Sequence, residues 1–90
     1  MFQVKISKEL DKYLRKIKNR PLKSATIKKM KEIISQDKKT INNYKNLRHN
    51  LSNFKRVHIL KSFVLLFKVD YEKKIIYFHE LNHHDKVYKK

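Results

Sequence analysis

Hydrophobic and polar residues alternate at the start of the chain, and the spacing then becomes helical. Phe2, Val4 and Ile6 are separated by polar residues, which predicts a first strand. Ser7 follows as a candidate N-cap, because its side chain can accept a hydrogen bond from the first turn of a helix. After it, the apolar residues recur every three or four positions, which predicts one buried helical face formed by Leu10, Tyr13, Leu14 and Ile17.

A proline divides the helical region into two. The first helix should end by Arg20, because the residue before a proline disfavours helical backbone. Pro21 itself suits the first turn of a second helix. That helix has a stripe predicted to be buried, made of Ile27, Met30, Ile33 and Ile34. Residues 36–53 are polar and irregular, which predicts a loop in which residues 44–47 are a candidate short strand.

Three strand patterns close the chain. Residues 54–59 fit a strand with His58 on the face opposite Val57 and Ile59. Residues 63–69 form a nearly continuous apolar run, as in a strand buried on both faces. A hairpin turn at residues 70–73 leads into a return strand at residues 75–81. The pattern therefore predicts one α+β domain over residues 1–90, with an N-terminal strand and a two-helix hairpin packed on an antiparallel sheet of about four strands.

The charge of the chain narrows the class of partner. It has 24 Lys and Arg against 8 Asp and Glu, a formal net charge of +16. A small domain needs a net charge of only about 2–8 for solubility, and the excess repels itself unless a polyanion neutralises it. This balance favours nucleic acid or the ribosome over a membrane surface, and it also allows an acidic protein partner. The alternative is a solvated, lysine-biased surface.

Composition excludes several classes of protein. The chain has no cysteine, so disulfides and thiolate metal sites are excluded. Its longest uncharged apolar run, residues 63–67, is too short to span a bilayer. Residues 1–18 carry charges throughout and lack the apolar segment of a secretory signal. We therefore expect a cytoplasmic protein that does not cross a membrane.

Histidines, cations and aromatic rings supply the groups that RNA cleavage without a metal requires. In that reaction a base deprotonates the ribose 2′-hydroxyl, an acid protonates the leaving 5′-oxygen, and cations stabilise the phosphorane. The five histidines, the natural proton-transfer residues near neutral pH, are His49, His58, His79, His83 and His84. The candidate phosphate contacts are Lys55, Arg56, Lys61 and Lys86. The candidate rings for base stacking are Phe54 and Tyr88.

Each of these groups also has a structural interpretation. His79 lies in a strand, where a histidine is more often structural or simply exposed. His49 in a polar loop is more often solvated, and Tyr88 near the C-terminus is more often a packing residue. A zinc site built from His79, His83 and His84 would lack a carboxylate or thiolate at standard spacing, so we expect neither a metal site nor a cofactor. The residues alone indicate a basic RNA-binding domain that could be a nuclease.

The C-terminal half resembles a known family. Residues 82–88, Asn-His-His-Asp-Lys-Val-Tyr, resemble the Gly-His-Arg-x-x-Val-Tyr ending of RelE-type toxins and, in the same register, the Gly-Ser/Thr-His-x-x-Leu-Phe ending of YafQ-like toxins. Residues 44–51 resemble the YafQ stretch in which a Lys is followed by His-x-Leu, and residues 54–59 resemble its Tyr-Arg-x-x-His-Val/Ile segment. With the matching order of elements, the resemblance to the RelE/ParE superfamily covers nearly the whole chain.

This resemblance implies a RelE-like fold and a function. The chain would be the toxin of a type II toxin-antitoxin system, an endoribonuclease that cleaves messenger RNA on the ribosome by 2′-hydroxyl attack and so arrests translation. The positions carried over as catalytic are His49, His58, His84 and Tyr88. His84 would transfer protons or contact phosphate, and Tyr88 would stack on a base.

Two positions depart from the family pattern. Ser62 stands where the family has an Asp before an aromatic residue, and Glu80 stands where it has an Arg in the last strand. The missing Asp weakens a complete acid-base set. The missing Arg leaves phosphate stabilisation to Lys55, Arg56 or Lys86.

The resemblance also implies partners and leaves two other functions open. The partners would be messenger RNA on the ribosome and an acidic cognate antitoxin, in a toxin-antitoxin hetero-oligomer that could bind operator DNA. A ParE-like inhibitor of DNA gyrase has the same fold without nuclease chemistry, and fold alone does not separate the two. A supercoiling assay does. The third function, a basic RNA-binding domain without catalysis, would be favoured by unrestrained expression that does not arrest growth.

Overall fold

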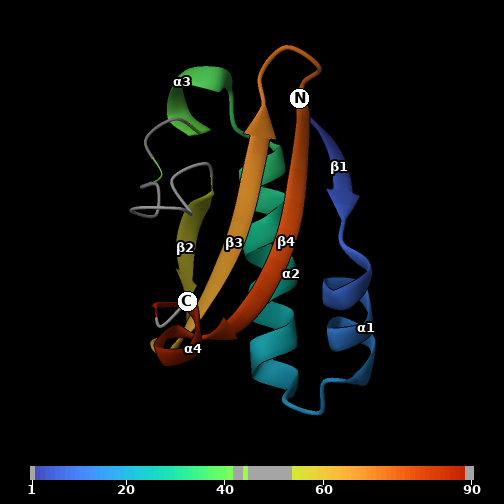
Figure 1. The fold of residues 1–90 in the computed structure, drawn as a ribbon, viewed down its shortest axis with the longest axis vertical. Coiled ribbons are helices and arrows are strands. Elements are labelled where there is room, and N and C mark those ends of the chain that lie inside the picture. Colours follow the sequence, from blue (N-terminus) through green and yellow to red (C-terminus); the bar gives the residue numbers. More distant parts are fainter. Residues whose placement is uncertain (1, 42–43, 45–53, 89–90) are drawn as a thin grey trace.

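A computed structural model describes residues 2–41, 44 and 54–88. The elements are β1 (Gln3–Ile6), α1 (Lys8–Lys16), α2 (Arg20–Ile34), α3 (Lys38–Ile41), β2 (Lys55–Ile59), β3 (Phe63–Asp70), β4 (Ile75–His83) and α4 (His84–Tyr88) (Figure 1). The α+β class is confirmed, as is the order of one strand, two helices and three strands. The short helices α3 and α4 were not predicted. No helix in this part of the chain is long and apolar enough to cross a membrane.

The sheet is mixed rather than wholly antiparallel. Its strand order is β1-β4-β3-β2, with β3 antiparallel to both β2 and β4. β1, however, runs parallel to β4, from Gln3 beside Ile75 to Ile6 beside Phe78. The prediction of an antiparallel sheet is wrong for this pairing. β2, β3 and β4 are joined by short turns, which force neighbours to run in opposite directions, whereas β1 leads into helices and is free of that constraint.

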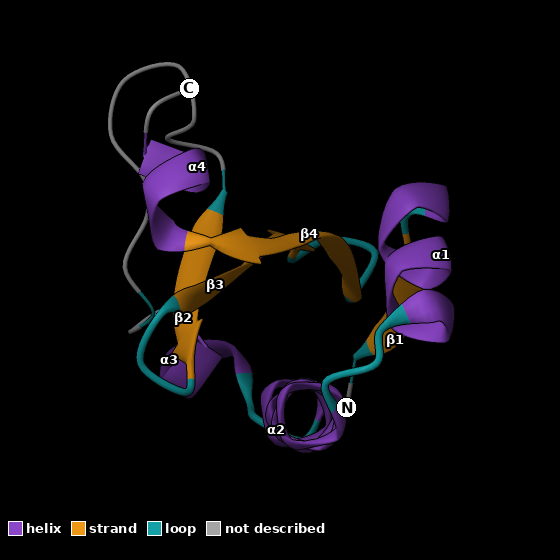
Figure 2. Ribbon diagram, turned by 90° about the horizontal axis from the view of Figure 1, so that it is seen from below, coloured by secondary structure: helices purple, strands orange, loops and turns teal. Residues whose placement is uncertain are grey.

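One face of the sheet is buried under the two long helices. Phe67 of β3 and Phe78 of β4 are fully buried, with ring centroids 5.9 Å apart. They belong to one cluster with Leu10 of α1 and with Leu22 and Ile33 of α2. Figure 2 shows α2 below the strands and α1 beside β1. The two central strands therefore carry the core.

The buried stripe of α2 differs from the predicted one. Met30 and Ile33 are buried as predicted, but Ile27 is exposed and the stripe continues through Leu22 and Thr26. Thr26 can lie in the core because its hydroxyl donates to the Leu22 carbonyl at 2.8 Å. Because the stripe contains a polar residue, the apolar residues alone indicated a neighbouring face that includes Ile27.

β1 is the strand whose burial the alternating pattern overstated. Phe2, just before it, is buried, but Val4 and Ile6 remain 38% and 42% exposed. They occupy the edge of the sheet, since among the described strands β1 pairs with β4 alone. An alternating pattern identifies a strand but does not reveal whether a helix covers its apolar face.

Ser7 fixes the junction between β1 and α1. Its Oγ accepts from the Leu10 backbone N–H at 3.0 Å, so the predicted N-cap is confirmed. The same hydroxyl donates to the His79 carbonyl of β4 at 2.6 Å. One side chain thus caps the helix and attaches it to the sheet.

The hairpin between β3 and β4 contains an unfavourable backbone conformation. Asp70 Oδ1 accepts from the N–H groups of Glu72 and Lys73, which holds the turn closed. Lys74 then adopts φ 56°, a left-handed conformation in which Cβ crowds the following carbonyl. The chain has no glycine to place there.

Replacing Lys74 by Gly should therefore stabilise the fold. Relief of the left-handed conformation is worth about 1–2 kcal/mol, and the greater freedom of glycine in the unfolded chain costs about 0.5–1 kcal/mol. The net gain should be about 0.5–1 kcal/mol in the free energy of unfolding by urea titration. Lys73→Gly is the matched control and should stabilise nothing, because Lys73 has no positive φ. A Lys74→Gly protein less stable than its parent would contradict this account.

Candidate functional site

The sheet face opposite the long helices carries polar and aromatic side chains in register. Strand alternation places Val64, Leu66 and Lys68 of β3 on this open face. The cross-strand rows are His58–Val64–Asn82, Arg56–Leu66–Glu80 and Lys68–Tyr77–Lys5. The open face therefore runs from the lysines of β1 and β3 to His58 of β2, in the row of Asn82 near the end of β4.

A β-bulge interrupts the last strand. Leu66 pairs with Glu80 but the next residue, Phe67, pairs with Phe78, so His79 is the extra residue on β4. Its carbonyl accepts the Ser7 hydroxyl, and its ring lies 4.9 Å from the Phe54 ring. His79 therefore has structural partners through both backbone and ring, which supports its structural interpretation.

Phe54 covers a small apolar cluster on the open face. It packs against Val64 and Leu66, both buried on the side away from the main core. The Lys68 ammonium lies 5.4 Å from the centre of its ring, within cation-π range. Phe54 is half-buried, so this ring is part of the fold as well as a candidate for base stacking.

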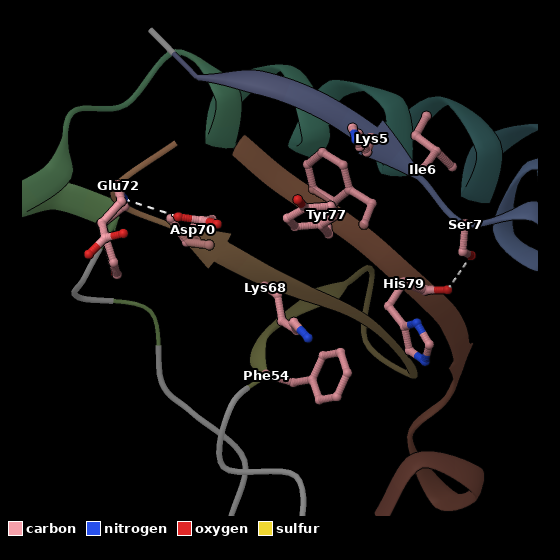
Figure 3. Close-up of a pocket in the computed structure, with 12 residues that line it drawn as sticks. Lys5, Ile6, Ser7, Phe54, Lys68, Asp70, Glu72, Tyr77 and His79 are labelled. Atoms are coloured by element: carbon pink, nitrogen blue, oxygen red, sulfur yellow. Dashed lines mark hydrogen bonds between the residues drawn. The ribbon is translucent and has the colours of Figure 1, made fainter. Parts of the chain in front are cut away.

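A cleft of about 970 Å³ follows the open face between β1 and Phe54 (Figure 3). Lysines and rings alternate along it: Lys5 lies 5.9 Å from the centre of the Tyr77 ring, and Lys68 faces Phe54. Asp70 and Glu72 line its end at the hairpin. Cations that track a phosphate backbone beside rings that accept stacked bases are the usual elements of a single-strand nucleic-acid site.

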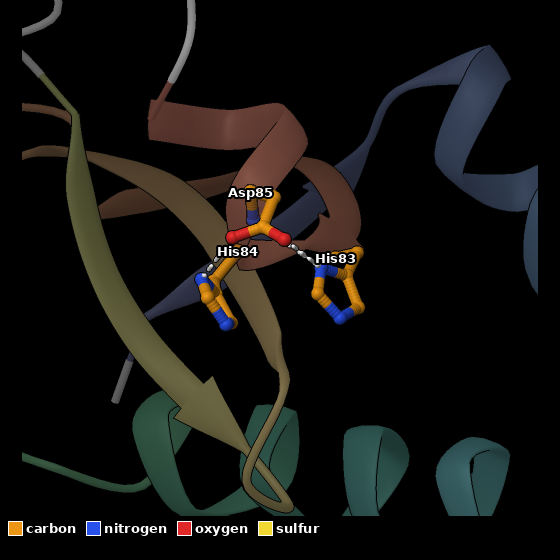
Figure 4. A group of neighbouring side chains, drawn as sticks. All are labelled: His83, His84 and Asp85. Carbon is orange, nitrogen blue, oxygen red and sulfur yellow. Dashed lines mark hydrogen bonds and ion pairs between the residues drawn. The ribbon is translucent and has the colours of Figure 1, made fainter.

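His84 opens α4 at the end of the last strand. Its backbone N–H donates to the Ser62 carbonyl at 2.8 Å, which joins α4 to the turn between β2 and β3. Its Nδ1 lies 3.0 Å from Asp85 Oδ1, and its ring stacks on His83 with centroids 4.7 Å apart. In Figure 4 the Asp85 carboxylate lies between the two imidazoles. The His84 side chain is 41% exposed and so accessible to a substrate.

The contact with Asp85 gives His84 a defined chemistry. A neutral imidazole next to a carboxylate places its proton on Nδ1, as the donor of that contact. The lone pair is then on Nε2, which Figure 4 shows pointing away from Asp85. A carboxylate in this position orients the ring and stabilises the imidazolium that forms when Nε2 takes a proton. His84 can therefore act as a general base.

The other predicted site residues that the structure describes lie on β2, in the β2–β3 turn and on α4. His58 is exposed on β2, in the same row as Asn82 of β4. Asn82 in turn comes two residues before His84, the first residue of α4. Arg56 is half-buried in the next row, Lys61 is exposed in the β2–β3 turn, and Lys86 is exposed on α4. Tyr88 is the last residue of α4, and His49 lies outside the described residues.

Lys55 does not fit its predicted role in phosphate binding. It pairs with Phe67 on the core face of β2, only 7% exposed, and its Nζ donates to the Tyr44 carbonyl at 3.2 Å. Burial lowers the pKa of this ammonium. The prediction failed because Lys55 and Arg56 are adjacent in a strand and must point to opposite faces.

Sequence reasoning also missed functional candidates. Lys5, Lys68 and Tyr77 line the cleft, and Asp85 contacts His84. Alternation along β3 and β4 could have revealed Lys68 and Tyr77. Each lies between two sequence neighbours that point to the core face, so its own side chain must point to the open face. No sequence pattern could have assigned Asp85, because its contact depends on the helical turn that begins at His84.

Comparison with known proteins identifies one group of relatives. No model of a known protein family matches the chain. A Methanocaldococcus jannaschii protein named "Putative toxin RelE4" is 48% identical, in an alignment that covers 100% of this chain and 94% of the relative. The fold is similar to a chain of the Mycobacterium tuberculosis RelBE2 toxin-antitoxin complex (18% identity, TM-score 0.71, 91% and 96% of the two chains). It is also similar to YafQ of Escherichia coli (13% identity, TM-score 0.69, 98% and 99%).

The buried ammonium of Lys55 predicts a pH dependence of stability. Because its pKa is lower in the folded protein than in the unfolded chain, the folded state releases this proton first. The contribution of Lys55 to stability should therefore rise as pH increases through the lowered pKa toward about 10.4, the value in an unfolded chain. The parent should therefore gain stability relative to Lys55→Met over this range. Urea titrations from pH 7 upward measure the free energy of unfolding of both proteins, and the value for Lys55→Met minus that of the parent should fall. Lys61→Met is the control for removing an exposed lysine, and a constant Lys55→Met difference would contradict the burial.

Proposed function

Because the chain belongs to the RelE family of toxins, we propose that it is the toxin of a toxin-antitoxin pair and that it cleaves messenger RNA on the ribosome. The observation that carries the proposal is the His84–Asp85 pair at the end of a basic, ring-lined sheet face. The pair supplies an accessible, oriented base, and the open face supplies a track for a single RNA strand. Such a protein acts in the cytoplasm, where the ribosomes are.

The RNA strand would lie along the open face. Lys5 and Lys68 contact phosphates in the cleft, and the rings of Tyr77 and Phe54 contact bases. A net charge of +16 draws the strand to the protein from a distance. The scissile phosphate would then sit beyond His58, at the end where α4 begins.

His84 starts the cleavage step in this proposal. Its Nε2 takes the proton of the 2′-hydroxyl, the 2′-oxygen forms a bond to phosphorus, and the bond from phosphorus to the 5′-oxygen breaks. The leaving 5′-oxygen takes a proton, for which the exposed His58 is the candidate donor and His49 the second. The products are a 2′,3′-cyclic phosphate and a 5′-hydroxyl. No metal ion takes part in the step, since a 2′-hydroxyl attack needs only proton transfer and charge stabilisation.

Cations around α4 would stabilise the charged phosphorane. Lys61 is exposed in the β2–β3 turn and Lys86 on α4, the two elements that the His84 backbone hydrogen bond joins, and Arg56 lies one row further along the sheet. These cations take the role of the Arg that the family has in the last strand, at the position that Glu80 occupies in this chain. Tyr88 would stack on a base beside the cleaved bond. The ribosome holds the messenger in place, and this effective concentration offsets a sparse set of catalytic groups.

The proposal includes an acidic antitoxin as partner. The M. tuberculosis relative in fold occurs in a toxin-antitoxin complex, which supports a partner of this kind. The edge strand β1 offers the exposed Val4 and Ile6, and the basic surface offers charge complementarity. A chain that folds on this surface could neutralise the charge while it covers the apolar edge.

Replacing His84 by Gln should abolish most of the cleavage without unfolding the protein. Loss of a general base costs about two to four orders of magnitude in rate, whereas a partly exposed substitution usually changes stability by about 0.5 kcal/mol or less. The assay is a translation extract with a defined messenger, scored for cut sites and product ends, beside a melting curve. Asp85→Asn should lower cleavage in the same direction, because the amide has no negative charge to stabilise the imidazolium that forms when Nε2 takes a proton.

Two results would reject this assignment. One is a His84→Gln protein that melts normally and cuts at the parental rate, or a product with a 5′-phosphate. The other is continued protein synthesis together with blocked DNA supercoiling, which would transfer the chain to the gyrase-inhibiting class.

The lysines of the cleft should contribute to the salt dependence of RNA binding. For a single strand, the slope of log K against log salt changes by about 0.7 for each phosphate contact. Lys68→Met and Lys5→Met should each reduce the slope by about this amount, measured by anisotropy with an RNA carrying 2′-deoxyribose at the cut site. Lys55→Met, on the core face, is the matched control and should leave the slope unchanged. Equal slopes for Lys68→Met and Lys55→Met would argue against the cleft as the RNA track.

A further inference from the structure

Three potential metal ligands lie together at the start of α4. His83, His84 and Asp85 each offer one ligand atom, and the three atoms lie within 4.8 Å of one another. Asp85 approaches both rings, with Oδ1 3.0 Å from His84 Nδ1 and Oδ2 3.7 Å from His83 Nδ1. Bonds of about 2.0–2.2 Å in a tetrahedral zinc site place ligand atoms roughly 3.3–3.6 Å apart. The three side chains are partly exposed, so they have room to rotate toward that arrangement (Figure 4).

The hydrogen bonds show which atoms of this cluster act as acceptors and so offer a lone pair to a metal ion. His83 Nδ1 accepts from the Asp85 backbone N–H at 3.3 Å, so this nitrogen has its lone pair on the side of Asp85. The Asp85 carboxylate is a second acceptor beside it, and a short contact links that carboxylate to His84 Nδ1. The backbone N–H of Asp85 already donates to His83 Nδ1, so among the side chains only one proton, the one on His84 Nδ1, lies between the three groups. A cation in its place would bind all three.

The ligand types select a class of metal. Two imidazole nitrogens and one carboxylate oxygen suit zinc, copper or nickel, whereas magnesium and calcium prefer oxygen alone. Asp85 offsets part of the ion's charge. The net charge of +16 opposes any cation, but charges further away than about 8 Å are largely screened at physiological ionic strength. Three protein ligands leave the fourth position of a tetrahedral ion for water.

The backbone that carries these ligands is held in place. His83 ends β4, paired with Phe63, and the His84 N–H is bonded to the Ser62 carbonyl. The site differs from a zinc site built from His79, His83 and His84, because His79 packs against Phe54 on the open face and Asp85 provides the carboxylate which that set lacks.

We propose that His83, His84 and Asp85 bind a divalent transition-metal ion such as Zn²⁺, and that the bound ion inhibits RNA cleavage. Metal on His84 Nδ1 displaces the proton from that nitrogen, and the neutral ring then carries its proton on Nε2. Nε2 is the atom assigned above to accept the 2′-hydroxyl proton, so the metal-bound ring no longer acts as a base. The inhibition rests on the proposed function, but the metal site does not.

Metal binding is measured without any activity. Co²⁺ added to the metal-free protein should give the visible absorption of a nitrogen- and oxygen-ligated ion at one equivalent, and Zn²⁺ should remove it. His83→Gln and Asp85→Asn should each lose this spectrum. His58→Gln, which changes a histidine outside the group, is the control and should keep it. A parent that gives no spectrum, a His83→Gln or Asp85→Asn protein that keeps it, or a His58→Gln protein that loses it overturns the site.

Inhibition is measured in the translation extract with parent and His83→Gln in parallel. His83 is outside the proposed catalytic set, so its variant should cleave at the parental rate without added metal. Zn²⁺ should reduce parental cleavage by about two orders of magnitude or more, the effect of losing a general base, and should spare His83→Gln. Since both proteins meet the same ribosomes, effects of zinc on the ribosome cancel. Equal inhibition of the two proteins overturns the regulatory role, while a parent that never cleaves rejects the proposed function and leaves the Co²⁺ result to decide the site.

Discussion

The structure depends on a sheet whose two long helices both cover the same face. The two long helices α1 and α2 both pack where Phe67 and Phe78 are buried, so neither of them covers the opposite face. That face closes its small apolar cluster with Phe54 and fills the rest with long lysines, rings and a histidine. The surface proposed to bind RNA is therefore a direct consequence of how the core is covered.

The bulge at His79 determines which residues near the end of β4 reach this surface. Strict alternation from Phe78 would put Glu80 in the core and Leu81 outside, whereas the extra residue reverses them and buries Leu81. The reversal also sets the direction in which the strand passes into α4. The Ser7 hydroxyl, bonded to the His79 carbonyl, secures the bulge from the neighbouring strand. Site geometry at His84 thus depends on an interaction made more than 70 positions earlier in the sequence.

Asp85 links the two proposals made for the end of the sheet. Its carboxylate holds the Nδ1 proton of His84, which leaves Nε2 available as a base. The same carboxylate and the adjacent His83 complete a ligand set in which a metal would replace that proton. A proton and a metal ion compete for one nitrogen, so a single arrangement of three consecutive residues accounts for both a catalytic state and an inhibited one.

The sequence by itself determined the charge, the strands, the two long helices and the family resemblance, because each depends on composition or on spacing within one segment. His58 was correctly placed opposite Val57 and Ile59 for the same reason. Tertiary structure alone decided the parallel pairing of β1, the exposure of Val4 and Ile6, the burial of Lys55 and the contact between Asp85 and His84. These depend on which strand lies alongside another, where a helix packs and where a bulge falls, and periodicity along one segment does not encode contacts between segments.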